Sequence, residues 1–178
     1  MFAVEAHSGQ RRKNSAMPYI IHPMEACSIA ATLTDDTDVL IAVLLHDTVE
    51  DTDTTLDDIR REFGDRVAGF VEGETEEKYN EIPREQSWKL RKEISLSHLS
   101  TAQREVKIMW LADKLSNLRS FCRLYAAEGD AMWDHFNCKD KSLQEWYYRT
   151  VLDSLSEFSG CEAYDESLSR VNTIFAEE

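Results

Sequence analysis

The residues best suited to chemistry directly follow an apolar run. Positions 39–45 are all apolar, and the next six residues are His46-Asp47-Thr48-Val49-Glu50-Asp51. If one helix continues through this run, the His and the Glu are four residues apart, as are the two Asp residues, so all four crowd one end of the helix. Burying such charge without compensation is costly. A divalent cation would neutralise the cluster, and mixed imidazole and carboxylate suits Mn, Fe or Zn better than Mg or Ca.

Two isolated polar residues in apolar surroundings extend this set. His22 lies in the sequence YIIHP, and Asp113 ends the sequence WLAD. Each alone is more often a satisfied core group than a ligand, and an HD dipeptide alone is more often a helix-terminal His beside a solvated acidic turn. Taken together, the residues form a candidate four-ligand metal site that consists of His22, His46, Asp47 and Asp113.

The elements that must position these residues are predicted to be helices, since apolar residues recur at helical spacing and no strand-like alternation is found. The segment 73–101 is highly charged and is predicted to be a mostly solvated helix or loop. We therefore expect one all-α, bundle-like domain over 1–178, with the metal site between its central helices. The predicted helices are 2–10, 24–33, 38–49, 56–63, 66–72, 103–127, 141–158 and 164–176. Capping residues are expected at 35–37 before the helix 38–49, at Thr54 or Thr55 before 56–63 and at Asp65 before 66–72, and Gly64 is expected to end 56–63.

Composition limits the partners and the compartment. The chain carries 34 Asp and Glu against 20 Lys and Arg, a net charge of −14 that disfavours binding to a nucleic-acid backbone. The longest apolar run is far shorter than the ~20 residues of a membrane span, and no signal peptide is recognised. The four cysteines lack CxxC spacing and are predicted to be free thiols. We expect a cytoplasmic protein without membrane or nucleic-acid partners.

Three longer motifs carry a family resemblance. The stretches AHSGQRRKNSAMPYIIHP, LLHDTVEDTDTTLDDIRREFG and LADKLSNLR resemble HD-domain phosphohydrolases, and within them the hydrolase domain of RelA/SpoT proteins. They are especially similar to small alarmone hydrolases of the metazoan SpoT-homologue type. The run HDTVEDT is more specific than HD alone, because its Glu-Asp pair marks this branch.

The resemblance implies an activity and a role for each residue of the site. It implies that His22, His46, Asp47 and Asp113 bind one Mn²⁺ ion, and that Glu50 and Asp51 position and activate water. The reaction would remove the 3′-pyrophosphate of ppGpp or pppGpp, giving GDP or GTP. A chain of 178 residues is expected to lack the synthetase and regulatory regions of long RelA/SpoT enzymes.

The resemblance also implies a nucleotide pocket. Its candidate residues are Arg12 and Lys13 in the loop before His22, and Asn117 and Arg119 after Asp113. Tyr147 could stack on a base. Each candidate has an ordinary structural explanation as well: a solvated charged face for the cations, a surface position for the Asn, and core packing for the Tyr.

Three departures from the family pattern and two rival functions stand beside this interpretation. Ser116 stands where relatives often carry a larger His or Tyr, Glu74 replaces an apolar residue, and the 13–18 loop lacks a common glycine. The rival functions are hydrolysis of another nucleotide phosphate, such as the 2′-phosphate of NADPH, and an antitoxin-like role beside an alarmone synthetase. The sequence predicts no oligomeric state.

Overall fold

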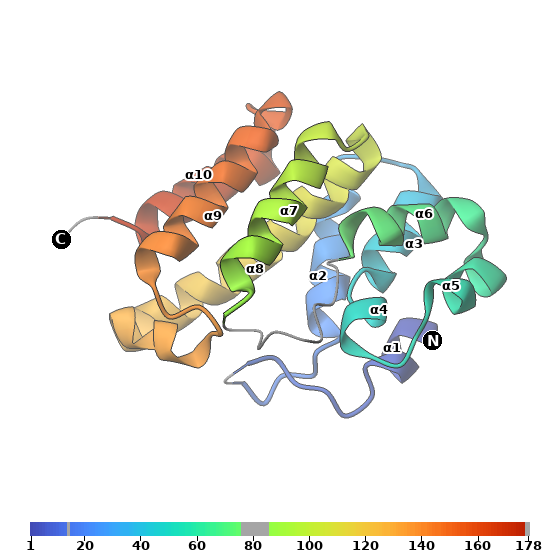
Figure 1. Ribbon diagram of the computed structural model, residues 1–178, viewed down its shortest axis with the longest axis horizontal. Coiled ribbons are helices and arrows are strands. Elements are labelled where there is room, and N and C mark those ends of the chain that lie inside the picture. Colours follow the sequence, from blue (N-terminus) through green and yellow to red (C-terminus); the bar gives the residue numbers. More distant parts are fainter. Residues whose placement is uncertain (14, 76–85, 177–178) are drawn as a thin grey trace. The chain divides into compact units, whose positions relative to one another are not determined.

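The fold is all-α, as predicted. The computed structural model describes residues 1–13, 15–75 and 86–176, and in this part of the chain it contains helices and a single isolated bridge between Arg11 and Pro18 but no strand. The helices in order (Figure 1) are α1 (Phe2–Ala6), α2 (Ile21–Ala30), α3 (Thr37–Leu45), α4 (Thr48–Asp51), α5 (Leu56–Phe63), α6 (Asp65–Glu74), α7 (Trp88–Thr101), α8 (Arg104–Glu128), the 3₁₀ helix η1 (Gly129–His135), α9 (Lys141–Ser154), the 3₁₀ helix η2 (Ser156–Phe158) and α10 (Glu162–Ile174).

The chain divides into two compact units. The first unit comprises residues 1–76 and 102–116, and the second comprises 77–101 and 117–178. Helix α8 is continuous and passes from the first unit into the second between Ser116 and Asn117. The expectation of a single domain over 1–178 stays a prediction.

The core of the first unit lies around α3. This helix packs against α2 and α6, and α6 packs in turn against α5. Val39, Val43 and Val67 are at most 1% exposed. The predicted N-cap chemistry before α3 is confirmed, because the Asp36 carboxylate accepts a hydrogen bond from the Asp38 amide at 3.0 Å.

The predicted helix 38–49 ends earlier than expected, and this corrects the sequence-based bounds. Helix α3 stops at Leu45, the chain turns at positions 46–47, and the short helix α4 starts at Thr48. Two side chains bind carbonyls of the last turn of α3. His46 Nδ1 lies 2.7 Å from the Val43 carbonyl, and the Thr48 hydroxyl donates to the Leu45 carbonyl, also at 2.7 Å. These bonds satisfy carbonyl groups at the end of α3 and place the His-Asp pair at its C-terminal tip.

Helices α5 and α6 follow the local sequence signals closely. Thr55 and Asp58 form a capping box at the start of α5. Gly64, at φ +89°, separates the two helices. The predicted range 56–63 is confirmed, while Asp65 is the first residue of α6 rather than its cap.

The second unit contains α7, the C-terminal part of α8, η1, α9, η2 and α10, and α9 packs against both α7 and α10 (Figure 1). The prediction that 73–101 is mostly solvated is wrong for the α7 part, because Trp88, Leu96 and Leu99 are buried. Charged residues between these apolar positions obscured the buried stripe. Residues 76–85 of that stretch lie outside the described part of the chain, as do Glu177 and Glu178.

None of the described helices combines the length and the apolarity needed to span a bilayer.

Candidate metal centre

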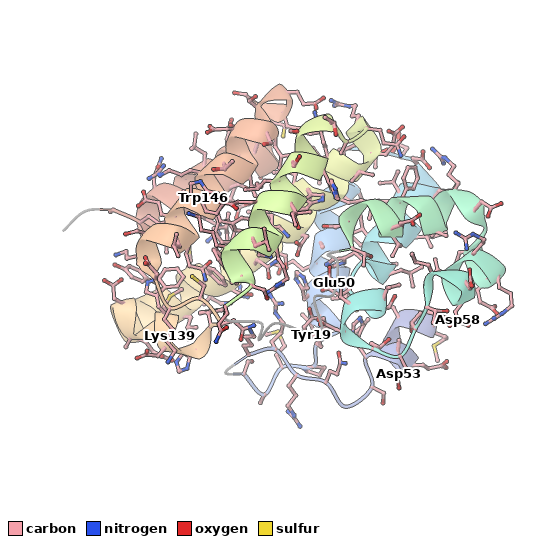
Figure 2. The ribbon with its side chains drawn as sticks, in the orientation of Figure 1. Tyr19, Glu50, Asp53, Asp58, Lys139 and Trp146 are labelled. Carbon is pink, nitrogen blue, oxygen red and sulfur yellow. The ribbon has the colours of Figure 1, made fainter. Side chains whose placement is uncertain are left out.

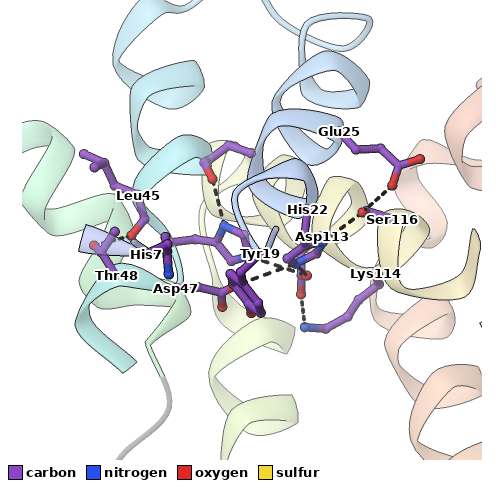
Figure 3. Close-up of polar contacts among 12 residues, drawn as sticks. His7, Tyr19, His22, Glu25, Leu45, Asp47, Thr48, Asp113, Lys114 and Ser116 are labelled. Carbon is purple, nitrogen blue, oxygen red and sulfur yellow. Dashed lines mark hydrogen bonds and ion pairs between the residues drawn. The ribbon is translucent and has the colours of Figure 1, made fainter. Parts of the chain in front are cut away.

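Three segments of the first unit bring two imidazoles and two carboxylates together (Figure 3). His22 comes from the first turn of α2, His46 and Asp47 come from the turn between α3 and α4, and Asp113 comes from α8. The Asp113 Oδ1 atom lies 3.0 Å from His22 Nε2 and 3.5 Å from His46 Nε2. The Asp47 Oδ2 atom lies 3.4 Å from His22 Nε2 and 3.1 Å from His46 Nε2. His22, His46 and Asp113 therefore form a compact trio, and Asp47 contacts both imidazoles.

Three of the four residues of the cluster are buried. His22, His46 and Asp113 are 3–5% exposed, whereas the side chain of Asp47 is 17% exposed. Burial lowers the pKa of His46, but the neighbouring charge of Asp47 and hydrogen bonding to Asp113 and Asp47 raise it overall to well above its usual value. Without a cation, a proton on His46 offsets part of the carboxylate charge. A metal would therefore compete with protons for this site.

His46 is oriented by the backbone. Its Nδ1 atom is 2.7 Å from the Val43 carbonyl, which can only accept, so Nδ1 carries the proton and Nε2 presents its lone pair to the cluster. That Nε2 atom is buried and lies 3.1 Å from Asp47 Oδ2 and 3.5 Å from Asp113 Oδ1. In the neutral imidazole, its lone pair therefore faces two carboxylates in a buried setting, which is the arrangement that a metal ligand requires.

His22 is oriented by side chains. Its Nδ1 atom lies 2.8 Å from the Ser116 hydroxyl, and that hydroxyl donates to the Glu25 carboxylate at 2.7 Å (Figure 3). Ser116 is fully buried, and Glu25 is half-buried.

Each carboxylate is held by its own partner. The Tyr19 hydroxyl donates to Asp47 Oδ2 at 2.7 Å, and burial together with the charge of Asp47 raises the pKa of Tyr19 far above its usual value. Asp113 pairs through Oδ2 with the Lys114 ammonium, whose nitrogen is 4.4 Å from the centre of the Trp110 ring. Burial raises the pKa of Asp113, but Lys114 and the two imidazoles outweigh this and hold it well below its usual range.

The donor set fits a divalent cation. Ligand atoms about 2.1 Å from one ion are separated by about 3.0 Å at right angles and by about 3.4 Å at tetrahedral angles. The four nitrogen-to-oxygen separations span 3.0–3.5 Å. One nitrogen from each His and one oxygen from Asp113 also lie within 4.8 Å of one another. Two neutral imidazoles and two carboxylates carry a charge of −2, which a divalent ion balances.

The two predicted catalytic acids lie beside this cluster in sequence and line a cleft. A cleft of about 610 Å³ in the first unit is lined by Glu50 and Asp51, together with Phe2, Ala6, Gln10, Thr52, Asp53, Thr54, Asp58 and Arg61 (Figure 2 labels Glu50, Asp53 and Asp58). None of the four predicted ligands lines it. With four acids and one cation on its walls, the cleft is a poor place for several phosphates. Asp51 is nevertheless near enough to Tyr19 for its charge to contribute to the raised pKa of that hydroxyl.

Comparison with known proteins now places the chain in a family. The sequence model of the HD domain family matches residues 1–139. The chain belongs to the HD domain family. It is 43% identical over 120 residues to the guanosine-3′,5′-bis(diphosphate) 3′-pyrophosphohydrolase of Aquifex aeolicus, covering 67% of this chain and 16% of that one. It is 42% identical over 125 residues to the enzyme of the same name, MESH1, of Xenopus tropicalis, covering 68% and 66% of the two chains.

Two solved structures resemble this HD-domain protein. The crystal structure of lmo0812 from Listeria monocytogenes EGD-e matches with a TM-score of 0.75 and 33% identity, covering 88% of this chain and 99% of that one. A structure described as a metazoan orthologue of SpoT that hydrolyses ppGpp matches with a TM-score of 0.73 and 26% identity, covering 97% and 90%. The resemblance predicted from the sequence motifs is confirmed, and membership of this family together with the donor set supports a divalent metal.

The predicted substrate residues of the HD-domain protein are distributed over both units. In the first unit, Arg12 is half-buried, with its guanidinium 5.6 Å from the centre of the Tyr19 ring, and Lys13 is exposed. Position 14 of the same loop lies outside the described residues. In the second unit, Arg119 pairs with Glu166 through two hydrogen bonds, of 2.9 and 2.6 Å.

The other two substrate candidates also belong to the second unit. Asn117 is half-buried and stands one turn after Asp113 on α8. Tyr147 is 3% exposed, and its ring packs against Trp88 and Tyr148 with centroids 5.9 and 5.3 Å apart. This packing favours the core interpretation of that ring, and base stacking stays a prediction.

Two residues that support the metal centre were not assigned a role from sequence. Tyr19 and Glu25 each bind a site residue or its partner, and only their adjacency to motif residues could have indicated this. Glu74, noted as a departure from the family, has both carboxylate oxygens buried without a hydrogen-bond partner. Burial raises the pKa of Glu74 to about 8, with smaller contributions from charged residues of the centre. A buried acid in an otherwise apolar position was the available signal.

Proposed function

We propose that this HD-domain protein is a Mn²⁺-dependent guanosine-3′,5′-bis(diphosphate) 3′-pyrophosphohydrolase that releases pyrophosphate from ppGpp and pppGpp. The observation that carries the proposal is the convergence of two imidazole nitrogens and two carboxylate oxygens at 3.0–3.5 Å. The similarity to relatives that bear this enzyme's name supports the choice of substrate. The chain spans 16% and 66% of the lengths of those relatives.

The ligands of the ion would be His22, His46, Asp47 and Asp113. Mixed nitrogen and oxygen donors favour a first-row metal over an all-oxygen Mg²⁺ or Ca²⁺ site, and among these we propose Mn²⁺. When bound, such an ion lowers the pKa of coordinated water and stabilises charge that develops on phosphoryl oxygens.

The catalytic acids would be Glu50 and Asp51. They stand on α4, the short helix that begins directly after the ligand Asp47. A carboxylate at this position can accept a proton from the attacking water and hold that water in line with the scissile bond. The acidic cleft beside α4 is a place from which water reaches these two residues.

Positive charge for the substrate would come from residues that surround the centre. Lys114 is half-buried beside Asp113, and Arg12 lies over Tyr19, whose hydroxyl binds Asp47. Both cations could form charge-assisted hydrogen bonds to a substrate phosphate. Lys13, Asn117, Arg119 and Tyr147 complete the proposed nucleotide-binding set. Arg119 would bind substrate only in competition with its ion pair to Glu166.

We further propose a single functional domain that works in the cytoplasm on a small-molecule nucleotide. All four cysteines are free thiols, which suits a reducing compartment.

The decisive experiment mixes purified protein with ppGpp and MnCl₂ and measures pyrophosphate release. We expect turnover that needs the metal and that Asp47→Ala abolishes. A nucleotide panel that includes NADPH separates the proposed substrate from a rival phosphate ester. Intact ppGpp after long incubation with metal-loaded protein would contradict the proposal, and turnover of NADPH alone would replace the substrate.

A further inference from the structure

The structure carries an inference about residues that do not touch the metal. A histidine that binds an ion through Nε2 must carry its proton on Nδ1, and something must hold that proton. For His22 the group within reach is the Ser116 hydroxyl, at 2.8 Å in a buried setting. A hydroxyl can donate or accept, so Ser116 alone does not decide which nitrogen of His22 holds the proton.

Glu25 decides it. The Ser116 hydroxyl donates to the Glu25 Oε2 atom at 2.7 Å, so its single proton points toward Glu25. The Ser116 oxygen then offers His22 only a lone pair. Nδ1 must be the donor, and Nε2 is left with its lone pair toward Asp47 and Asp113 (Figure 3).

The spacing of these groups shows how two helices make the arrangement. On α2 the residue three positions after His22 is Glu25, and on α8 the residue three positions after Asp113 is Ser116. Residues three apart lie on one face of a helix. Each helix therefore supplies one ligand and, about one turn further on, one member of the hydrogen-bonded pair.

We propose that Ser116 and Glu25 are positioning residues, which fix the tautomer and the ring orientation of His22 and thereby set the affinity of the centre for its metal. This proposal deepens the proposed function and rests on its metal site. It also gives a role to a departure from the family, because Ser116 is small enough to be fully buried between His22 and Glu25.

The first test compares Mn²⁺ affinity by calorimetry in wild type and Ser116→Ala. We expect the variant to bind about 10- to 100-fold more weakly, since outer partners of ligating histidines have effects of this size. Ser116→Thr keeps the hydroxyl and should recover most of the affinity. Glu25→Ala, which leaves the serine free to turn its proton toward His22, should also weaken binding.

The matched control is Ser167→Ala. Ser167 is likewise fully buried on a helix, and its hydroxyl donates to the Ala163 carbonyl at 2.7 Å, but it belongs to the second unit. Both alanine variants should lose a similar amount of thermal stability without metal. Only Ser116→Ala should gain a smaller increase in melting temperature when MnCl₂ is added.

A spectroscopic readout excludes a merely structural role. In protein loaded with diamagnetic Zn²⁺, the His22 Nδ1 proton should give a slowly exchanging, downfield ¹H–¹⁵N signal that Ser116→Ala removes and Ser116→Thr retains. If wild type binds Mn²⁺ and Ser116→Ala binds it equally well, the positioning role is overturned while the proposed function stands. If wild type binds no Mn²⁺, the metal site itself is overturned, and the proposed function with it.

Discussion

The two imidazoles of the centre are held by different kinds of partner. His46 gives its Nδ1 proton to a main-chain carbonyl, that of Val43, at 2.7 Å. His22 donates its Nδ1 proton to the Ser116 hydroxyl, which donates in turn to the Glu25 carboxylate. No substitution removes a backbone carbonyl, whereas one point mutation removes a hydroxyl. The His46 side of the centre is therefore secured by the fold, and the His22 side is adjustable through sequence.

Removal of either imidazole should have the same large effect on activity, whichever kind of partner holds it. His22→Ala and His46→Ala should each lower ppGpp hydrolysis by about 10³-fold or more, because an ion in this role contributes several kcal/mol of transition-state stabilisation. Pyrophosphate release at saturating MnCl₂ measures the effect. His98→Ala, on the exposed surface of α7, should retain full activity. A variant that lacks one ligand imidazole yet keeps normal turnover would remove that residue from the ligand set.

On the His46 side of the centre, the buried acid Glu74 should make the stability of the protein depend on pH. Burial is the main reason that the pKa of Glu74 is raised from 4.5 to about 8, and the charge of His46 acts in the opposite direction. The folded protein therefore holds this proton more tightly than the unfolded chain. The contribution to stability is complete below about pH 4.5, declines as pH rises, and is lost as pH passes about 8.

The measurement is the free energy of unfolding of metal-free protein between pH 5 and pH 8. Wild type should lose up to about 1.4 kcal/mol per pH unit relative to Glu74→Gln, which stays neutral throughout. Parallel pH profiles for the two proteins would show that Glu74 does not titrate within the fold in this range.

The difference between backbone and side-chain support can also be tested at Val43. Val43→Ala removes buried methyl groups from a residue that is 1% exposed, and should cost about 2 kcal/mol of unfolding free energy. The carbonyl that holds His46 remains, so Mn²⁺ affinity should stay within about twofold of wild type. Val39→Ala, on the same helix and fully buried, should behave in the same way. Chemical denaturation and calorimetry give the two quantities, and a large loss of affinity in Val43→Ala alone would mean that its side chain takes part in positioning His46.

A smaller effect is expected at the shared ligand Asp47. Tyr19→Phe keeps the ring but removes the hydroxyl that donates to Asp47 Oδ2 at 2.7 Å. Mn²⁺ affinity should fall about tenfold, which is the smaller end of the 10- to 100-fold range typical for residues that hydrogen-bond to a metal ligand. Tyr164→Phe, which removes a hydrogen bond of 3.3 Å to the Leu152 carbonyl in the second unit, is the matched control. Equal affinities in the two variants would show that the Tyr19 hydroxyl does not support the ligand.

Much of the fold could be predicted from local signals. The capping residues Asp36 and Thr55 and the glycine at position 64 placed helix ends within a few residues, because each satisfies or ends a backbone hydrogen-bond pattern on its own. The break between α3 and α4 could not be predicted in this way. It depends on the His46 and Thr48 side chains binding carbonyls of α3, and hydrophobic periodicity contains no information on such bonds.

The candidate site, like the fold, could be predicted only in part. The convergence of His22, His46, Asp47 and Asp113 could be anticipated, because short motifs on apolar helices place them in one core. The partners that hold them could not, since Ser116 lies 91 residues from Glu25 and only the tertiary fold joins the two. The burial of α7 was missed for a related reason. Its apolar residues are buried by packing against α9, a contact that only the tertiary fold creates.

The row from His22 through Ser116 to Glu25 has a consequence for how such chains can change over generations. A hydroxyl at position 116 orients the imidazole only while an acid stands at position 25, and an acid there no longer acts on the imidazole once the hydroxyl is gone. The two positions should therefore mutate in concert: relatives with a bulkier ring at the first should have replaced the acid at the second. The pair would then be inherited as one unit.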